Sequence, residues 1–186
     1  METDGGTSFG KWPNRTAQLI YFDAMPALLP TVTGPVVDLG GGNGLLKQWL
    51  PQALSVDKDA SKEPDVVADL LTWSSTNYPT GVMRYVLHYL PDEQAQQLLT
   101  HVATYLNRLV LVQFVNDDLP AKQANSLNEQ VWFRTETQLS ALLGPWQVVE
   151  RRRLDYTVDA EFYRWRLNNP NGTAHTEGIV MLDLRV

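Results

Sequence analysis

Short apolar runs alternate with amphipathic segments along the first two thirds of the chain. The apolar runs have the length of buried strands and lie at 35–39, 53–56, 66–68, 81–85 and 109–115. The segments whose apolar residues have helical spacing are 14–29, 44–50 and the stretch that begins at Pro91. Strands that alternate with helices in short units predict a parallel sheet with right-handed crossovers. The most hydrophobic strand, 109–115, is expected inside that sheet.

The last third of the chain has a different pattern. Thr135-Glu136-Thr137-Gln138 matches a capping box, in which the first and last side chains satisfy backbone N–H groups at the start of a helix. Strand-like runs follow at 147–156, 161–167 and 178–186 with no helix between them, so they are expected to pair antiparallel. We therefore expect an α/β three-layer sandwich, whose mostly parallel central sheet of about seven strands ends in an antiparallel C-terminal hairpin edge.

Composition and charge narrow the class of partner. The 186 residues are 44% hydrophobic and 19% charged, an ordinary globular balance at a length that suits one domain. The formal net charge is −6, and Arg151-Arg152-Arg153 is the basic run. A nucleic-acid partner is disfavoured but not excluded, because phosphate neutralisation requires a basic face and a net acidic chain can still carry a local basic patch. The chain contains no cysteine, which excludes disulfides, thiolate metal sites and cysteine nucleophiles.

The start of the sequence is not expected to be a signal peptide. Residues 1–10 are polar and lack the apolar core of a signal peptide. No apolar run approaches the length of about 20 residues that a membrane-spanning helix needs. We therefore expect a cytoplasmic protein with no membrane partner.

A glycine-rich turn, Asp38-Leu39-Gly40-Gly41-Gly42-Asn43-Gly44, lies between an expected strand and an expected helix. Glycines allow positive φ and let a ligand approach the backbone closely. Ligands of open α/β sheets bind at the carboxyl ends of strands, where this turn lies, and the helix behind it presents N–H groups. A tight turn that is glycine-rich for structural reasons alone remains the alternative.

Two nucleotide-binding motifs do not fit this turn. The dinucleotide motif G-x-G-x-x-G requires a glycine or alanine where Leu45 stands. The phosphate-binding loop requires a glycine directly before its lysine, and Leu46 precedes Lys47. The pattern that remains is acid-x-Gly-x-Gly-x-Gly, from Asp38 to Gly44. It resembles motif I of the class I (Rossmann-like) S-adenosylmethionine-dependent methyltransferases.

The resemblance covers about residues 35–115 and implies that S-adenosyl-L-methionine is the cofactor. It implies that Asp57, after the second strand, binds both ribose hydroxyls, because a carboxylate can accept two hydrogen bonds from a vicinal diol. Asp59 is the alternative acid. It also implies that Asp69 and Leu70 meet the adenine, although Asp57 and Asp69 taken singly could be solvated loop acids. The implied cofactor-binding residues are Asp38, Gly40, Gly41, Gly42, Asn43, Gly44, Asp57, Lys58, Asp69, Leu70 and Arg84.

The segment after the fourth strand is similar to the family segment that runs beneath the methionine portion of the cofactor. Arg84 and Tyr85 are expected to line the floor of that pocket. His88 is either a general base, since imidazole titrates near neutral pH, or a partly buried structural histidine. The candidate catalytic residues are therefore Tyr85 and His88.

The acceptor pocket of this architecture is built by the N-terminal arm and by the segments after the fourth and fifth strands. Aromatic side chains there can stack on a flat substrate, or they can belong to ordinary packing. The candidate substrate residues are Trp12, Tyr21, Tyr89 and Trp132. Residues 116–130 are polar and are expected to form a mobile loop over the site.

We expect one methyltransferase domain over residues 1–186. It comprises an N-terminal arm and helix at 1–34, a cofactor-binding core at 35–115, and a substrate-side loop, helix and antiparallel strands at 116–186. The expected reaction is methyl transfer to a small molecule. The alternatives are an RNA or protein methyltransferase that uses the surface around Arg151-Arg152-Arg153, and a non-catalytic cofactor-binding protein. We expect no catalytic metal, because the fourth strand ends in Arg84-Tyr85 where metal-dependent relatives carry a carboxylate.

Overall fold

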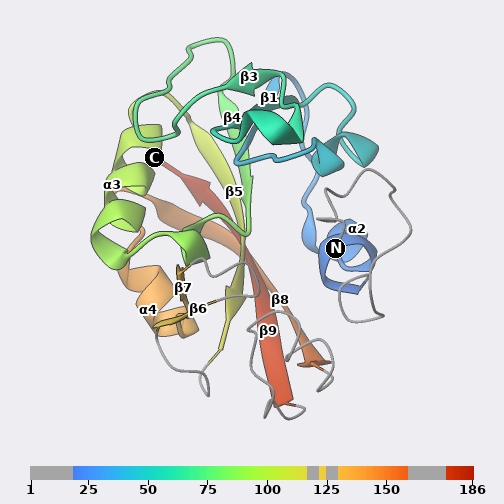
Figure 1. Ribbon diagram of the computed structural model, residues 1–186, viewed down its shortest axis with the longest axis vertical. Coiled ribbons are helices and arrows are strands. Elements are labelled where there is room, and N and C mark those ends of the chain that lie inside the picture. The colour runs from blue at the N-terminus through green and yellow to red at the C-terminus, as the bar shows by residue number, and fades with distance from the viewer. Residues whose placement is uncertain (1–18, 117–121, 125–129, 159–174) are drawn as a thin grey trace.

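A seven-stranded mixed sheet forms the centre of the molecule (Figure 1). The computed structural model describes residues 19–116, 122–124, 130–158 and 175–186. The strands are β1 (Val36–Leu39), β2 (Leu54–Asp57), β3 (Val66–Val67), β4 (Thr80–Arg84), β5 (Arg108–Val115), β8 (Gln147–Val158) and β9 (His175–Arg185). Their order is β3-β2-β1-β4-β5-β9-β8. Neighbours from β3 to β5 pair in parallel, whereas β9 pairs antiparallel with both β5 and β8, as the sequence predicts.

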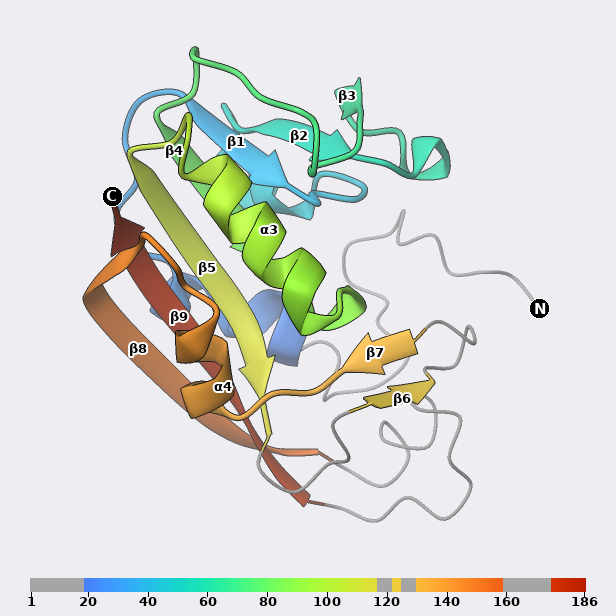
Figure 2. The same cartoon turned by 90° about the vertical axis from the view of Figure 1, so that its left-hand side faces the viewer.

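Hydrophobic cores cover both faces of the sheet, which makes the molecule a three-layer sandwich. Successive residues of β1 point to opposite faces, so Val36 belongs to one core and Val37 to the other. One face packs against η1 (Leu19–Asp23) and α2 (Met25–Leu28), and the other against α3 (Asp92–Val102) and α4 (Glu136–Ala141). Figure 2 shows α3 lying across the face of the sheet along β5. The predicted fold class is therefore confirmed.

Two of the predicted helices are confirmed. Pro91 caps α3, with Asp92 and Glu93 in its first turn, where the helix dipole favours acids. The capping box at the start of α4 is complete: the Thr135 hydroxyl accepts from the Gln138 backbone N–H, and the Gln138 side chain accepts from the Thr135 N–H. None of the helices within the described ranges is both long and apolar enough to cross a bilayer.

Two predicted helices differ from the expected form. The helix expected at 14–29 is described only from Leu19, and from there it is the π-helical turn η1 followed by the four-residue α2. Pro26 explains the break, because proline has no N–H to donate and its ring clashes with the carbonyl four residues earlier. The helix expected at 44–50 is only a 3₁₀ turn, η2 (Leu45–Gln48), because Gly44 is left-handed and Pro51 follows closely.

The polar segment 116–130, expected as a loop, contains part of a small second sheet. The strands β6 (Lys122–Ala124) and β7 (Gln130–Trp132) pair antiparallel. Strands of three residues have no alternation long enough to recognise in a sequence, and β7 has only one buried position, which is why the segment reads as a loop. The strand expected at 161–167 lies outside the described residues.

Candidate functional site

The glycine turn lies at the carboxyl ends of the parallel strands. Gly40, Gly42 and Gly44 have φ values of 71°, 52° and 73°, which lie in the left-handed region that favours glycine. The backbone N–H groups of Gly40 and Gly41 donate to the carbonyl oxygen of Val56 at 2.8 and 3.2 Å, so the turn is anchored to β2. In Figure 2 the arrowheads of β1 and β2 point the same way, toward this edge.

Close packing requires glycine at two positions of the turn. A Cβ at Gly40 would lie 2.4 Å from the Val86 Cγ2, and a Cβ at Gly41 would lie 2.8 Å from the Asp38 Oδ2. At Gly42, by contrast, no atom of the described residues lies within 4 Å of the Cβ position, apart from those of Gly42 and its two chain neighbours. The turn is therefore packed against the protein on one side and open at Gly42.

Asp38 and Arg84 form a buried but incomplete ion pair beneath the turn. Arg84 Nη2 lies 3.5 Å from Asp38 Oδ2, which is long for a charge-assisted hydrogen bond. Among the described residues, neither Asp38 oxygen nor the Arg84 Nε has a hydrogen-bond partner. Asp38 is 1% exposed, and burial raises its pKa above the ordinary value even though the charge of Arg84 acts in the opposite direction. The pair therefore retains unused hydrogen-bonding capacity next to the turn.

Asp57 is directed at the same turn from the end of β2. Its Oδ2 accepts a hydrogen bond from the Gly42 N–H at 2.9 Å, and its Oδ1 accepts from the Asp59 N–H at 2.9 Å. The side chain of Asp59 points elsewhere, because it caps the short helix η3 (Ala60–Lys62) by accepting from Ser61. The structure therefore brings Asp57, and not the carboxylate of Asp59, to the glycine turn, while Lys58 is exposed beside it.

The segment after β3 runs beside the end of β2. The Ala68 N–H donates to the Asp57 carbonyl at 2.9 Å, which places Asp69 and Leu70 near Asp57 along the chain path. Asp69 is exposed, and its Oδ1 accepts from the Leu71 N–H at 2.9 Å, whereas Leu70 is buried. The predicted cofactor residues from three consecutive strands thus gather at one edge of the sheet.

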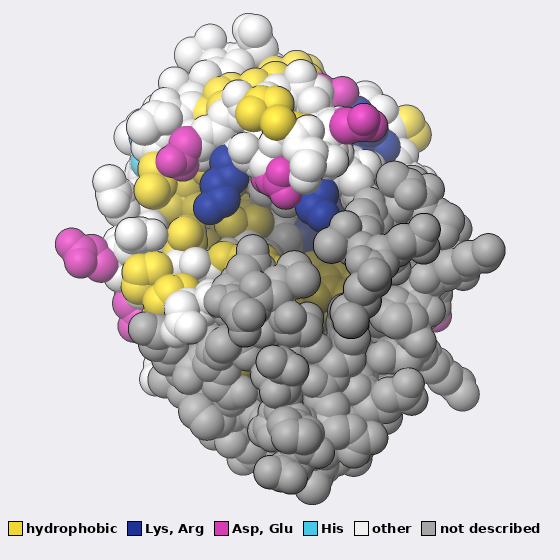
Figure 3. All heavy atoms as spheres, viewed as in Figure 1, with side chains coloured by type: hydrophobic (Ala, Val, Ile, Leu, Met, Phe, Trp, Pro, Cys, Tyr) yellow, Lys and Arg dark blue, Asp and Glu magenta, His cyan; other side chains and the backbone are white. Residues whose placement is uncertain are grey.

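Aromatic side chains cluster at the carboxyl ends of β4 and β5. Tyr85, which has a φ of 56°, stacks on Phe114 with ring centroids 4.2 Å apart. Tyr21 meets Tyr85 edge-on at 5.3 Å, and His88 meets Phe114 at 5.5 Å and Tyr89 at 4.0 Å. On the face of the molecule shown in Figure 3, hydrophobic side chains line a hollow beneath acidic and basic ones. Four of the predicted residues thus share one aromatic cluster.

The hydroxyl of Tyr85 already makes a hydrogen bond within the protein. It donates to the Ile20 carbonyl at 2.9 Å, and burial raises the pKa of the phenol well above its ordinary value. A phenol that is buried and donates to a carbonyl is poorly suited to accept a proton. These contacts favour a role for Tyr85 in shaping the pocket.

Two residues that sequence reasoning missed hold the segment of His88, the 3₁₀ helix η4 (Leu87–Tyr89). Gln113 of β5 accepts from the Leu87 N–H and contacts His88, and Arg134 donates to the carbonyls of Leu87 and Leu90. Gln113 could have been found, because it is the one polar residue in the apolar run 109–115. Arg134 carries no comparable signal in the sequence.

Trp132 borders a separate pocket of about 230 Å³. The other lining residues are Asp92, Phe133, Arg134 and Gln138. Arg134 joins this pocket to the His88 segment, since it also pairs with Asp92 at 2.8 Å. Trp12, the remaining substrate candidate, lies outside the described residues.

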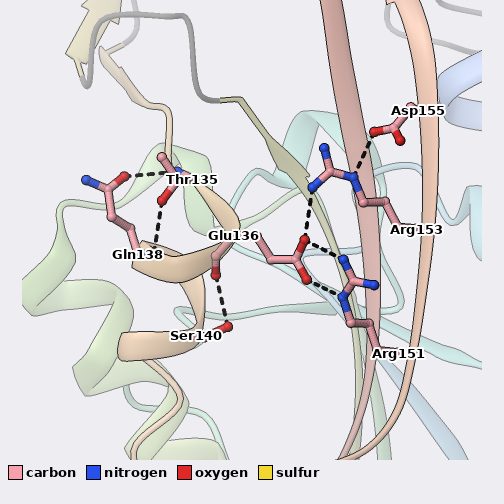
Figure 4. Close-up of polar contacts among 7 residues, drawn as sticks. All are labelled: Thr135, Glu136, Gln138, Ser140, Arg151, Arg153 and Asp155. Atoms are coloured by element: carbon pink, nitrogen blue, oxygen red, sulfur yellow. Dashed lines mark hydrogen bonds and ion pairs between the residues drawn. The ribbon is translucent and has the colours of Figure 1, made fainter.

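The basic run on β8 is occupied by ion pairs. Arg151 and Arg153 both pair with Glu136 of α4, and Arg153 also pairs with Asp155 at 2.7 Å (Figure 4). Arg152 pairs with Glu150 at 2.7 Å. The positive charge of all three arginines is therefore compensated locally.

Comparison with known proteins identifies the fold. The sequence matches no protein-family model, and it has no significant match among curated proteins. Among solved structures, the mitomycin 7-O-methyltransferase MmcR superposes with a TM-score of 0.62 and 17% identity, over 91% of this chain and 54% of that one. The chain thus spans about half the length of MmcR.

Two further structures match over most of their own length. The 1,6-didemethyltoxoflavin-N1-methyltransferase of Burkholderia thailandensis, with its substrate and S-adenosylhomocysteine bound, has a TM-score of 0.60 and 17% identity, over 90% of this chain and 79% of that one. An S-adenosylmethionine-dependent methyltransferase of Mesorhizobium loti has a TM-score of 0.58 and 16% identity, over 90% and 98%. The chain has the fold of the class I methyltransferases, as its motifs predict.

Proposed function

We propose that this chain binds S-adenosyl-L-methionine at the glycine turn and transfers its methyl group to a small molecule. The observation that carries the proposal is the position of Asp57. Its carboxylate accepts a hydrogen bond from the Gly42 N–H at the open side of the turn. An acid in that position suits a ribose diol, since both of its oxygens can accept hydrogen bonds. The 1,6-didemethyltoxoflavin-N1-methyltransferase, which was solved with S-adenosylhomocysteine bound, supports the same cofactor.

The buried pair beneath the turn fits the amino-acid end of this cofactor. A zwitterionic α-amino acid offers an ammonium group and a carboxylate, and the pair offers an acid and a guanidinium with unused hydrogen-bonding atoms. Asp38 would hold the ammonium group and Arg84 the carboxylate. Leaving these buried atoms without partners costs about 1 to 3 kcal/mol each, so a ligand that satisfies them gains affinity.

The reaction depends mainly on the positioning of the acceptor relative to the methyl group. When bound, the cofactor supplies a methyl group on a positively charged sulfur, which is already a good leaving group. The residues of the chain hold the acceptor in line and exclude water. The aromatic cluster of Tyr21, Tyr85, His88, Tyr89 and Phe114 supplies an apolar wall for a flat acceptor. Neighbours named for small-molecule substrates support this class of acceptor.

No contact in the described residues specifically supports the two alternatives, an RNA or protein methyltransferase and a non-catalytic cofactor-binding protein. A surface for RNA or for an acidic protein would need unpaired positive charge, and the three arginines of β8 are ion-paired. A non-catalytic protein of the same fold would bind the cofactor without turnover. Release of S-adenosylhomocysteine in the presence of small-molecule acceptors separates that alternative from the proposed enzyme.

Titration calorimetry tests the cofactor site directly. We expect the wild-type chain to bind S-adenosylmethionine and S-adenosylhomocysteine but not NAD. Asp57→Ala should weaken S-adenosylhomocysteine binding by about 10- to 100-fold, because it removes a charge-assisted acceptor worth about 1.5 to 3 kcal/mol.

Asp59→Asn is the matched control for this experiment. It changes a carboxylate two residues away that faces η3, and it keeps the backbone N–H that donates to Asp57. The control should bind with wild-type affinity. Equal affinity of the Asp57 variant and the wild type, or binding of NAD in place of S-adenosylhomocysteine, would contradict the proposal.

A further inference from the structure

His88 is held in place by buried polar side chains on both sides of its backbone. Gln113 Oε1 accepts from the Leu87 N–H at 3.2 Å, while Arg134 donates to the Leu87 and Leu90 carbonyls at 2.8 and 2.6 Å. Gln113 and Arg134 are only 2% and 4% exposed. The backbone on each side of the imidazole is therefore fixed relative to Gln113.

This arrangement determines which way the Gln113 amide faces. A backbone N–H can only donate, so the amide oxygen of Gln113 must face Leu87. The amide nitrogen then faces His88, and it lies 3.2 Å from the Nδ1 of the ring. Rotating the amide by 180° would set two donors against each other at Leu87, which a buried site disfavours.

The orientation of the amide in turn determines the protonation of the imidazole. An amide nitrogen only donates, so His88 Nδ1 must be the acceptor and cannot carry a hydrogen. A neutral imidazole has one N–H, which must then be on Nε2. The lone pair of Nδ1 is used by Gln113, and the other nitrogen is protonated.

We propose that Gln113 is a positioning residue that holds His88 as the Nε2–H tautomer, which makes this imidazole a hydrogen-bond donor and not the proton-accepting base of the site. The ring contacts Phe114 and Tyr89 in the aromatic cluster. The assignment of the cluster to the methyl acceptor rests on the proposed function, whereas the tautomer does not. An acceptor that needs to lose a proton must then lose it to another group.

Long-range ¹H–¹⁵N spectroscopy of the imidazoles tests the tautomer in the intact chain. The chain has three histidines, so the spectrum is simple, and His88→Gln identifies the signals of His88 by their loss. At a pH where the ring is neutral, we expect an unprotonated Nδ1 and a protonated Nε2. A wild-type spectrum with hydrogen on Nδ1 would overturn the proposal without the need for any variant.

Gln113→Glu provides the decisive variant. Both carboxylate oxygens are acceptors, so one can still accept from the Leu87 N–H while the other now accepts from His88 Nδ1. We expect the hydrogen to appear on Nδ1. Gln113→Leu, which has no hydrogen-bonding group at similar volume, should give a mixture of the two tautomers. Unchanged His88 signals in both variants would refute the role of Gln113.

His101 is the internal control in the same spectra. Its Nε2 lies 2.9 Å from the Trp73 carbonyl, which can only accept, so His101 carries hydrogen on Nε2 for a reason unrelated to Gln113. Its signals should not move in either variant. Calorimetry with S-adenosylhomocysteine on the same samples reports the cofactor site separately, so a wrong tautomer and a wrong function are distinguished.

Discussion

Asp38 and Arg84 form a buried pair in which the effects of burial and of charge oppose each other. Burial favours the protonated form of Asp38, and the guanidinium 3.5 Å away favours the ionised form. Burial has the larger effect, because the pKa of Asp38 is raised. The ion pair alone therefore does not compensate the desolvation of the carboxylate, and a second donor at Asp38 would be favourable.

At the residue scale, Arg84→Met should destabilise the protein in a manner that depends on pH. Without the guanidinium, the pKa of Asp38 rises further above its ordinary value of 3.8, so the folded state holds the proton more tightly than the unfolded state does. The added cost, about 3 kcal/mol, is then present at neutral pH and vanishes as the pH falls toward 3.8. Urea denaturation at neutral and at acidic pH measures it.

The double variant Asp38→Asn with Arg84→Met is the control for this prediction. It has no buried carboxylate to desolvate, so it should recover most of the stability lost at neutral pH. If Arg84→Met lowers the free energy of unfolding equally at both pH values, the effect comes instead from lost packing on Trp49, whose ring lies 6.0 Å from the guanidinium.

At the scale of the element, α4 is fixed by a local signal and by a charge network. The capping box begins the helix, and Glu136 then reaches across to Arg151 and Arg153 on β8 (Figure 4). A carboxylate that lies between two guanidinium groups stabilises the fold more than a single surface ion pair does. Solvent nevertheless screens this attraction, because the Arg151 side chain is 48% exposed. The network joins the last helix to the edge strand of the sheet.

Glu136→Gln should lower the free energy of unfolding by about 1 kcal/mol at neutral pH. The arginines hold the pKa of Glu136 below its ordinary value of 4.5. A lowered folded-state pKa means that the stabilisation is present above 4.5 and is lost as the pH falls through the folded-state pKa. Variant and wild type should therefore converge in acid, and high salt should reduce the difference at neutral pH.

Glu150→Gln is the matched control on the same surface. Among the residues that the structure describes, Glu150 pairs with Arg152 alone, and its side chain is 42% exposed, so its replacement should change stability by less than about 0.5 kcal/mol. Equal losses for the two variants would show that the shared position of Glu136 adds nothing to a simple pair.

Elements with strong local signals could be predicted from the sequence, and elements that depend on distant contacts could not. The apolar spacing after Pro91 and the capping box at Thr135 predict α3 and α4, because both signals act within a few residues. The pairing of β6 with β7 could not be predicted from three-residue strands.

The same distinction applies to the residues of the site. The position of Asp57 at the end of β2 could be predicted from the motif spacing, since strand ends meet at one edge of the sheet. The roles of Gln113 and Arg134 depend on contacts 25 to 47 residues away along the chain. No local pattern encodes such contacts. The aromatic cluster was foreseen as a set of candidates, but not as a stack with Phe114.

At the scale of the whole molecule, one side of the sheet has long strands paired along their length and the other ends in a short edge strand. β9 is hydrogen-bonded to β5 and β8 along its length, and residues 179–184 are buried. At the opposite edge, β3 has two residues and pairs with β2 alone, and Val67 is exposed. The edge next to the proposed adenosine site is therefore the part of the sheet that can open most easily.

Native-state hydrogen exchange should reproduce this gradient. We expect amide protons of residues 179–184 to exchange only through global unfolding, more than about 100-fold more slowly than those of β3, which exchange through local opening. Small additions of denaturant should accelerate exchange in β9 steeply and in β3 hardly at all. Faster exchange in β9 than in β3 would contradict the expected distribution of stability.

The position of β9 between β5 and β8 also affects how the protein is made. The ribosome delivers the chain in sequence order, and its earlier parts fold first. The five parallel strands can pair as soon as residue 115 has emerged, but β8 emerges before the strand that attaches it to the sheet. Until His175–Arg185 follows, the backbone N–H and C=O groups along the outer edge of β5 have no partner strand. The nascent polypeptide is therefore most prone to aggregation during this interval, and slower translation there would prolong its dependence on chaperones.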